Sequence, residues 1–179
     1  MKRFLYLSAI ILALIFAASC ASTQSADNDS YTYAGFKNIY PAVHYAIKEW
    51  KGISFNKSSR TVHSLDAVTI NGIQIMEGLR VFEFSLNITN ENNVITYRFS
   101  KFKSRSITNE TWINETGFRQ AGTSRSFTEY FNAEMPKVLE NDDLYYRMLK
   151  EVLVSQGSTE AQAAAEAERL RKEEAGYSR

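Results

Sequence analysis

The chain has 179 residues, with 21 Lys and Arg, 20 Asp and Glu, two His and a single Cys. The nearly balanced charge excludes a strongly basic nucleic-acid-binding protein. One Cys cannot form an internal disulfide or a Cys-rich zinc site, and two His are few for a metal cage, so we expect no metal and no cofactor.

The first 19 residues have the pattern of a secretory signal. Lys2 and Arg3 provide a positive start, an apolar stretch runs from Phe4 to Ala18, and small residues follow it. A helix that crosses a bilayer needs about 20 apolar residues, and this stretch is shorter. We therefore interpret residues 1–19 as a cleaved signal peptide and not as a membrane-spanning anchor.

The only Cys of the chain lies directly behind this stretch. The segment Ala17-Ala18-Ser19-Cys20 resembles the lipobox of bacterial lipoprotein precursors, although Ala17 stands where Leu is usual. The resemblance implies cleavage between Ser19 and Cys20 and transfer of a diacylglycerol to the Cys20 thiol, after which the new amino terminus can also be acylated. The alternative is ordinary cleavage that leaves Cys20 as a free thiol.

Lipidation of Cys20 predicts the membrane as a partner through the covalent lipid. Two or three acyl chains give stable attachment, because each buried methylene contributes about 0.8 kcal/mol. Removal of Lys2 and Arg3 leaves 19 basic and 20 acidic residues, a formal charge near −1, so attraction to anionic lipids is not expected. Ala21 resembles the sorting signal of outer-membrane lipoproteins. We expect a location in the bacterial cell envelope, at the outer membrane, with the periplasmic or surface face left open.

Composition divides the rest of the chain into three parts. Residues 20–30 form a lipidated N-terminus and a polar, flexible tether, which spans roughly 17 Å as a coil. Residues 31–154 are long enough for one domain with its own core. Residues 155–179 form a charged, Ala-rich helical tail. Because the tail has no stripe of large apolar residues, we predict an exposed helix, with a partner-binding helix as the alternative.

The domain begins with a predicted short strand over 31–36 and a helix over 38–51. Pro41 suits the first turn of this helix, and Gly52 is expected to end it in a left-handed conformation. Val43, Ile47 and Trp50 recur at helical spacing, which predicts one apolar face.

Alternating apolar residues then predict several strands. In 65–76, Asn71-Gly72 is typical of a hairpin turn, with a single bulged strand as the alternative. The segments 81–89 and 94–102 alternate strictly, and the turn between them predicts an antiparallel pair. The segment 104–113 is predicted to form another strand.

Two helical segments close the domain. Ser126-Phe127-Thr128-Glu129 has the spacing of a capping box and predicts the start of a short helix, which Pro136 should stop or kink. A second helix is predicted to start near Asn141 or Asp142, with one apolar side formed by Leu144, Tyr145, Met148, Leu149 and Val152.

This order of elements predicts an α+β domain, in which an antiparallel sheet of four to five strands has two main helices packed on one face. The Trp50 helix, the 66–75 region and the paired 82–86 and 97–99 segments resemble uncharacterised bacterial envelope domains with a fold like half of the TATA-binding protein. The resemblance carries no catalytic residues, and a shared fold does not imply DNA binding.

The sequence offers no recognisable catalytic site. His44 and His63 lie too far apart in sequence for a metal-binding pair on one helix, and we interpret His44 as a packed or flanking residue. The chain has no nucleophile elbow and no phosphate-binding loop. We therefore predict no catalytic, cofactor-binding or metal-binding residues. The mixed basic and aromatic run 101–105 is interpreted as a solvated strand end, or else as a contact for an anionic envelope polymer, and not as a nucleic-acid site.

These observations predict a lipid-anchored envelope lipoprotein with a non-catalytic binding or assembly domain, which recruits an envelope protein or polymer. One alternative is an envelope enzyme with an unrecognised site, for instance with His63 near carboxylates. The other is a carrier of an apolar ligand, which requires a cavity under the helices.

The Cys20→Ser variant tests the anchor. The hydroxyl cannot replace the thiol as the acceptor of the lipid, so we expect loss of processing, of lipid labelling and of the membrane-bound fraction. Metabolic labelling with a fatty acid and cell fractionation measure these changes. A variant that is processed and partitions like the parent protein would refute lipidation.

Overall fold

The computed structural model describes residues 30–32, 37–115 and 118–177. The predicted signal peptide, Cys20 and the tether up to residue 29 lie outside the described residues, as do residues 33–36 of the predicted first strand. The interpretation of these segments therefore remains a prediction from the sequence.

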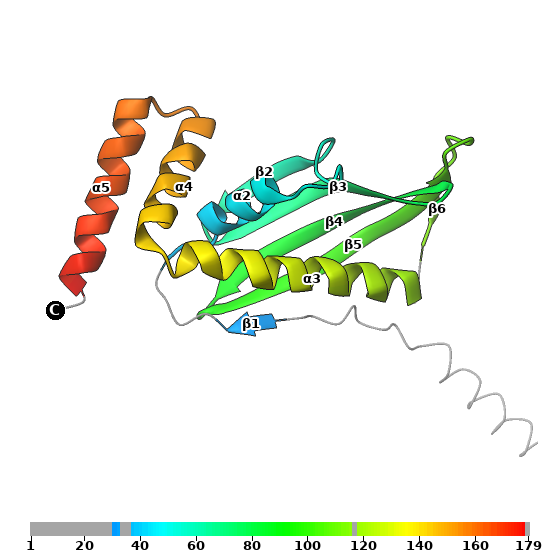
Figure 1. Ribbon diagram of the computed structural model, residues 1–179, viewed down its shortest axis with the longest axis horizontal. Helices are drawn as coiled ribbons and strands as arrows, with labels where there is room; N and C mark the ends of the chain where they lie inside the picture. The colour runs from blue at the N-terminus through cyan, green and yellow to red at the C-terminus, as the bar shows by residue number, and fades with distance from the viewer. Residues whose placement is uncertain (1–29, 33–36, 116–117, 178–179) are drawn as a thin grey trace, which may run out of the picture.

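The described chain forms an α+β fold in which helices cover one face of an antiparallel sheet, as predicted (Figure 1). The strands lie in the order β1-β5-β4-β3-β2, and β6 pairs with β5 on the same edge as β1 but near the other end of β5. The strands are β1 (Ser30–Thr32), β2 (Ser59–Ser64), β3 (Ala67–Glu77), β4 (Arg80–Glu91), β5 (Val94–Ser106) and β6 (Ile113–Asn114). The helices are α2 (Tyr40–Glu49), α3 (Phe118–Leu139), α4 (Asp142–Ser155) and α5 (Glu160–Tyr177).

Helix α2 has the predicted apolar face, but it ends differently from the prediction. Pro41 lies in its first turn, and Val43 and Ile47 are buried. The helix stops at Glu49 because Trp50 turns into an extended conformation, with φ −64° and ψ 116°. Gly52 is not left-handed, so the predicted cap is wrong. A Cβ atom on Gly52 would lie 2.3 Å from Trp50 Nε1. Glycine is therefore needed here because the Trp50 ring leaves no room for a side chain.

Strand β3 is continuous, so the Asn71-Gly72 hairpin is wrong and the alternative of a bulged strand is confirmed. Ile70 pairs with Leu86 and Ile73 with Phe84, which leaves the Asn-Gly pair as the bulge, with Gly72 at φ +71°. The long strand β4 offers partners on both sides of the bulge, which favours continuation of β3 over a turn. Strand β5 bulges opposite the same part of β4, with Lys101 at φ +58°.

The antiparallel pair of β4 and β5 is confirmed, and both residues of the Asn92-Asn93 turn have positive φ. The separate strand predicted over 104–113 is wrong, because β5 continues to Ser106 and only Ile113–Asn114 form a further strand. Local hydrogen bonds explain the break: Thr108 N donates to Ser106 Oγ and Thr111 N donates to Asn109 Oδ1. Such bonds compete with pairing in a sheet.

Helix α3 is longer than predicted. It begins at Phe118 and contains both Gly122 and Ser126, so the predicted capping box is wrong. The Ser126 hydroxyl donates to the Gly122 carbonyl inside the helix, at 3.2 Å. Pro136 does not stop the helix, which runs on to Leu139. Proline removes only its own intrahelical hydrogen bond, and the packed residues Met135 and Val138 on either side of it hold the last turn on the core.

An aromatic layer joins the inner face of the sheet to α2 and α3. We use this name for Trp50, Phe84, Phe127, Tyr130 and Phe131. Phe127 lies 5.0 Å from Phe84 and 5.1 Å from Trp50, measured between ring centroids. Tyr130 contacts both Trp50 and Phe131 edge to face. Large rings with this geometry contribute beyond their buried area, so the layer fixes both helices on the sheet.

Helix α4 begins as predicted, because the Asn141 side chain accepts a hydrogen bond from Leu144 N at 3.0 Å. The tail is helical as predicted and most of its residues are exposed, yet it also has a buried stripe that we did not expect. Ala163 is fully buried and Ala167 is 6% exposed where α5 packs against α4. The sequence did not reveal this stripe because alanines also occur on exposed helix faces and do not mark a buried one as large apolar residues do.

Substitution of Ala163 tests the packing of α5. We expect Ala163→Asp to lower the free energy of unfolding by about 2 kcal/mol, because it buries a carboxylate against α4. The exposed Ala164→Asp variant undergoes the same change in helix propensity and should lose only about 0.7 kcal/mol. Denaturant unfolding measures both values, and equal losses would show that α5 does not pack.

Candidate functional site

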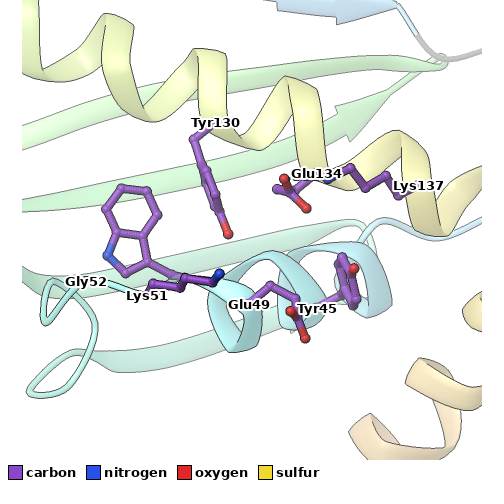
Figure 2. Close-up of a pocket in the computed structure, with 8 residues that line it drawn as sticks. Tyr45, Glu49, Lys51, Gly52, Tyr130, Glu134 and Lys137 are labelled. Atoms are coloured by element: carbon purple, nitrogen blue, oxygen red, sulfur yellow. Dashed lines mark hydrogen bonds and ion pairs between the residues drawn. The ribbon is translucent and has the colours of Figure 1, made fainter.

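An open groove lies between α2 and α3 and has a volume of about 490 Å³. Figure 2 shows side chains of both helices facing it, with Tyr45 and Glu49 on α2 and with Tyr130, Glu134 and Lys137 on α3. Trp50, Lys51 and Gly52, which follow α2, close one end of its lining. Ligand sites in proteins typically have about 300–1,000 Å³, so the groove has the size of a binding site.

The floor of the groove is rigid and aromatic. The Trp50 ring stacks on Phe127 at an interplanar angle of 16°, and Tyr130 meets Trp50 edge to face at 4.5 Å. The Trp50 Nε1 atom is buried and has no hydrogen-bond partner among the described residues. Buried donors of this kind are uncommon in folded proteins. In the floor of the groove, the Trp50 N–H group is therefore a donor without a partner among the described residues. The Trp50 ring itself is already covered by Phe127 and Tyr130.

Tyr130 connects the two helices across the groove. Its hydroxyl donates to the Ala46 carbonyl of α2 at 2.7 Å. Burial, together with the nearby carboxylates Glu134 and Glu49, raises the pKa of Tyr130 to about 12. The phenol therefore stays protonated at neutral pH and holds the helices together, which is a positioning role and not that of a base.

Charges of both signs stand on the rim of the groove. Lys137 pairs with Glu134 of the same helix at 2.6 Å. Glu49 and Lys51 are exposed, and within the described residues neither forms an ion pair. The rim thus offers one carboxylate and one ammonium group to a ligand, next to an aromatic floor.

His44 is a packed residue, as predicted. It is half-buried on α2, with Nδ1 3.2 Å from Arg60 of β2 and Nε2 3.6 Å from Glu151 of α4. Burial, helped by the Arg60 charge, lowers the pKa of His44. Within the described residues no cluster of three His, Cys, Asp or Glu side chains has the arrangement of a metal site.

His63 lies apart from the groove, on the outer face of the sheet. Its Nε2 atom is 2.9 Å from the Thr69 hydroxyl, and Thr69 in turn donates to Asn87. The basic and aromatic run 101–105 forms the end of β5, as predicted. Lys103 pairs with Glu83 at 2.8 Å, while Lys103 and Arg105 both lie over the Trp112 ring. The structure does not bring these residues together with His44 or the groove.

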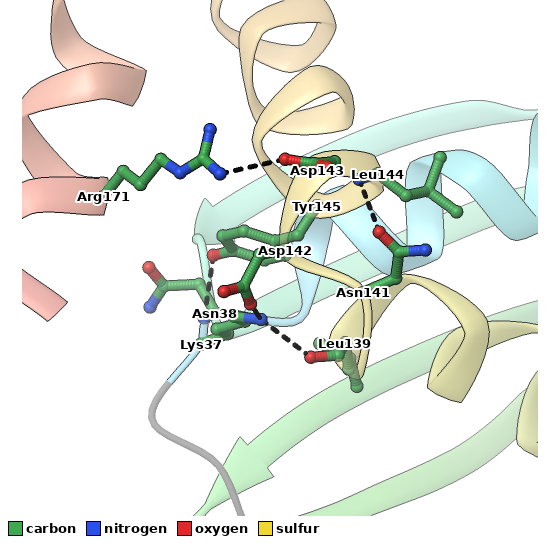
Figure 3. Close-up of polar contacts among 9 residues, drawn as sticks. All are labelled: Lys37, Asn38, Leu139, Asn141, Asp142, Asp143, Leu144, Tyr145 and Arg171. Carbon is green, nitrogen blue, oxygen red and sulfur yellow. Dashed lines mark hydrogen bonds and ion pairs between the residues drawn. The ribbon is translucent and has the colours of Figure 1, made fainter. Parts of the chain in front are cut away.

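A polar junction fixes the start of α4 beside the start of α2 (Figure 3). Lys37 donates to the Leu139 carbonyl at 3.0 Å and pairs with Asp142, which lowers the pKa of Asp142. The Tyr145 hydroxyl accepts a hydrogen bond from Asn38 N at 3.1 Å. Arg171 of α5 reaches Asp143 at 2.9 Å. Because its groups satisfy one another, we assign this junction to the fold and not to a ligand.

No protein-family model and no curated protein sequence matches this chain significantly. None of the described helices combines the length and the apolar character that crossing a bilayer requires. Function therefore has to be argued from the sequence pattern and from the groove.

The groove residues were missed in the sequence, although a signal is present. Tyr45 and Glu49 are spaced by four residues, as are Tyr130 and Glu134, so each helix has an aromatic and an acidic residue on one side. Such a pattern is typical of a solvated helix face. Only the approach of α2 to α3 turns the two faces into the walls of a groove.

The raised pKa of Tyr130 predicts a loss of stability at high pH. An unfolded tyrosine releases its proton near pH 10, whereas folded Tyr130 keeps it to about pH 12. The free energy of unfolding must therefore fall as the pH rises from 10 to 12.

Because the Tyr130→Phe variant lacks the ionisable group, its stability should fall less steeply than that of the parent protein over this interval. At pH 8 it should differ from the parent by about 1 kcal/mol, through the lost hydrogen bond to Ala46. Denaturant unfolding at several pH values measures both effects. If the free energies of unfolding of the parent protein and of the variant fell in parallel from pH 8 to 12, the raised pKa of Tyr130 would be contradicted.

Proposed function

We propose that this chain is a lipid-anchored lipoprotein of the bacterial cell envelope whose α+β domain is a non-catalytic binding module. The covalent lipid on Cys20 holds it at the membrane, most simply the outer membrane. The groove between α2 and α3 receives an extended segment of an envelope protein. The observation that carries the binding role is the groove itself, with Glu49 and Lys51, which form no ion pair within the described residues, above an aromatic floor.

The chemistry of the groove favours a peptide over a sugar polymer. Sugar binding by stacking needs a broad free aromatic face, but Phe127 and Tyr130 already cover Trp50, and Tyr45 of the lining is half-buried. A peptide presents amide groups and charged side chains, which suit the two unpaired charges on the rim. Because the groove is open to solvent and not an enclosed cavity, a segment of a partner can lie in it.

The rival functions find less support in the same residues. A carrier of an apolar ligand needs space between helices and sheet, where the rings of the aromatic layer are packed instead. An enzyme needs an activated group in the groove, but Tyr130 is held protonated by its burial and engaged with Ala46. Binding of a peptide, in contrast, requires neither an internal cavity nor an activated group.

Site-directed crosslinking in intact cells tests the groove. A photoreactive amino acid at Lys51 should give adducts of discrete mass, because this position lies on the rim. The same group at Lys57 is the matched control, since Lys57 is also exposed and belongs to the same loop but does not line the groove. Mass spectrometry of the adducts identifies the partner.

The charge-reversed variant Glu49→Lys should lose most of the adduct from position 51. Glu49 is exposed, so the variant should keep the melting temperature of the parent protein. Equal adducts at positions 51 and 57, or an adduct that survives Glu49→Lys unchanged, would remove the groove from the proposed function.

A further inference from the structure

One end of the sheet presents an exposed apolar surface. We call it the apolar tip, and it consists of Met76, Leu79, Ile107, Ile113 and the half-buried Trp112. Leu79 is 71% exposed, and Met76, Ile113 and Ile107 are 58%, 51% and 45% exposed. Met76 lies on the opposite face of the sheet from Ile113, because Ile113 shares its face with Ser104, Phe82 and Ile75, so the tip includes both faces of this end. Exposed large apolar side chains that occur together at one end of a fold are typical of an interaction site.

Two connections that are distant in sequence build the tip. Met76 and Leu79 flank the turn between β3 and β4, and the other residues belong to the loop and short strand after β5. Ile107 N donates to the Leu79 carbonyl at 3.0 Å, which joins the two connections. In Figure 1 this end of the sheet, near β6, points away from α4 and α5. The tip is therefore an ordered, projecting part of the fold.

The charges around the tip nearly balance, with three basic and four acidic side chains. Arg80 lies 3.5 Å from Glu115, and Lys103 lies 2.8 Å from Glu83. Arg105 lies over the Trp112 ring, 5.3 Å from its centroid. Glu77 and Glu110 are exposed nearby. Trp112 thus has Lys103 and Arg105 over its ring at the same end of the sheet as the exposed apolar residues. Tryptophan among basic and apolar side chains is typical of the interface between a bilayer and water.

The direction of β1 connects the tip to the membrane. Ser30 pairs with Thr96 and Thr32 pairs with Val94, so β1 runs antiparallel to β5. Strand β5 runs from Val94 towards the tip at Ser106. The N-terminal end of β1, Ser30, is therefore the end of this strand that faces the tip. Ten residue steps separate Cys20 from Ser30 and reach at most about 35 Å, which is about the length of the ten steps from Thr96 to Ser106.

We infer that the apolar tip inserts into the interfacial region of the bilayer to which Cys20 is anchored, and thereby sets the orientation of the domain on the membrane. The inference rests on the lipid anchor of the proposed function. A bilayer is favoured over a protein as the occupant, because a protein interface needs about 20–30 residues a side and the tip offers far fewer. With the lipid already holding the protein, a few inserted side chains suffice.

Fluorescence quenching in vesicles tests this inference. Protein purified from membranes of cells that express the full chain is reconstituted into phosphatidylcholine vesicles, with and without lipids brominated near the head group. Trp50 and Trp112 are the two tryptophans of the chain, and the aromatic layer shields Trp50. We expect brominated lipid to quench the emission of the parent protein and to leave that of the Trp112→Phe variant unchanged.

The Leu79→Ser/Ile113→Ser double variant should stay attached to the vesicles through its lipid but lose the quenching. The ratio of inserted to released tip should fall at least about tenfold, because two apolar side chains no longer enter the bilayer. The control is Val94→Ser, an exposed apolar residue at the opposite end of β5, which should retain the quenching. Balanced charges predict little effect of added salt or of anionic lipid.

Three outcomes would overturn the inference. The first is an attached protein whose emission brominated lipid does not change. The second is quenching that persists in the double variant. The third is Trp112 shielded from an aqueous quencher but untouched by brominated lipid, which would assign the tip to a protein surface such as a second copy of the chain. Failure to attach to vesicles at all would instead refute the anchor, so the two proposals are distinguished.

Discussion

The packing of α2 and α3 on the inner face of the sheet depends on the aromatic layer. Phe84 of β4 meets Phe127 of α3, which stacks on Trp50 at the end of α2. Because each ring contacts the next, neither helix can shift without breaking ring contacts in the other. The same packing leaves the polar sides of the helices facing each other across a gap. The groove is thus a consequence of how the core is built.

The bulges on either side of β4 are the second constraint. Gly72 and Lys101, both at positive φ, stand opposite the same part of this central strand. Each bulge inserts an extra residue, and so keeps the apolar residues on both sides of it turned to the helices. Phe102, beyond the bulge, stacks on Phe84 and extends the core towards the tip. The sheet therefore stays regular up to the end where the apolar tip projects.

The two proposals assign different parts of the molecule to different tasks. The proposed membrane contact is at the end of the sheet with the tip, whereas α4 and α5 lie at the other end (Figure 1). The groove lies between these ends, on the helical layer. A domain held in this way would present its groove sideways, parallel to the membrane surface, where a partner from the same envelope layer can approach.

The sequence by itself determined the α+β class, the apolar faces of α2, β4 and β5, and the start of α4 at Asn141, because these depend on local spacing and capping. Its interpretation of Cys20 as a lipid site also comes from local residues, and stays a prediction. Tertiary structure decided the rest. Asn71-Gly72 became a bulge because β4 paired on both sides of it, and α3 continued past Pro136 because its last turn is packed on the core. The buried Ala stripe of α5, the groove and the tip depend on which surfaces meet, and that information lies in contacts between residues far apart in the chain.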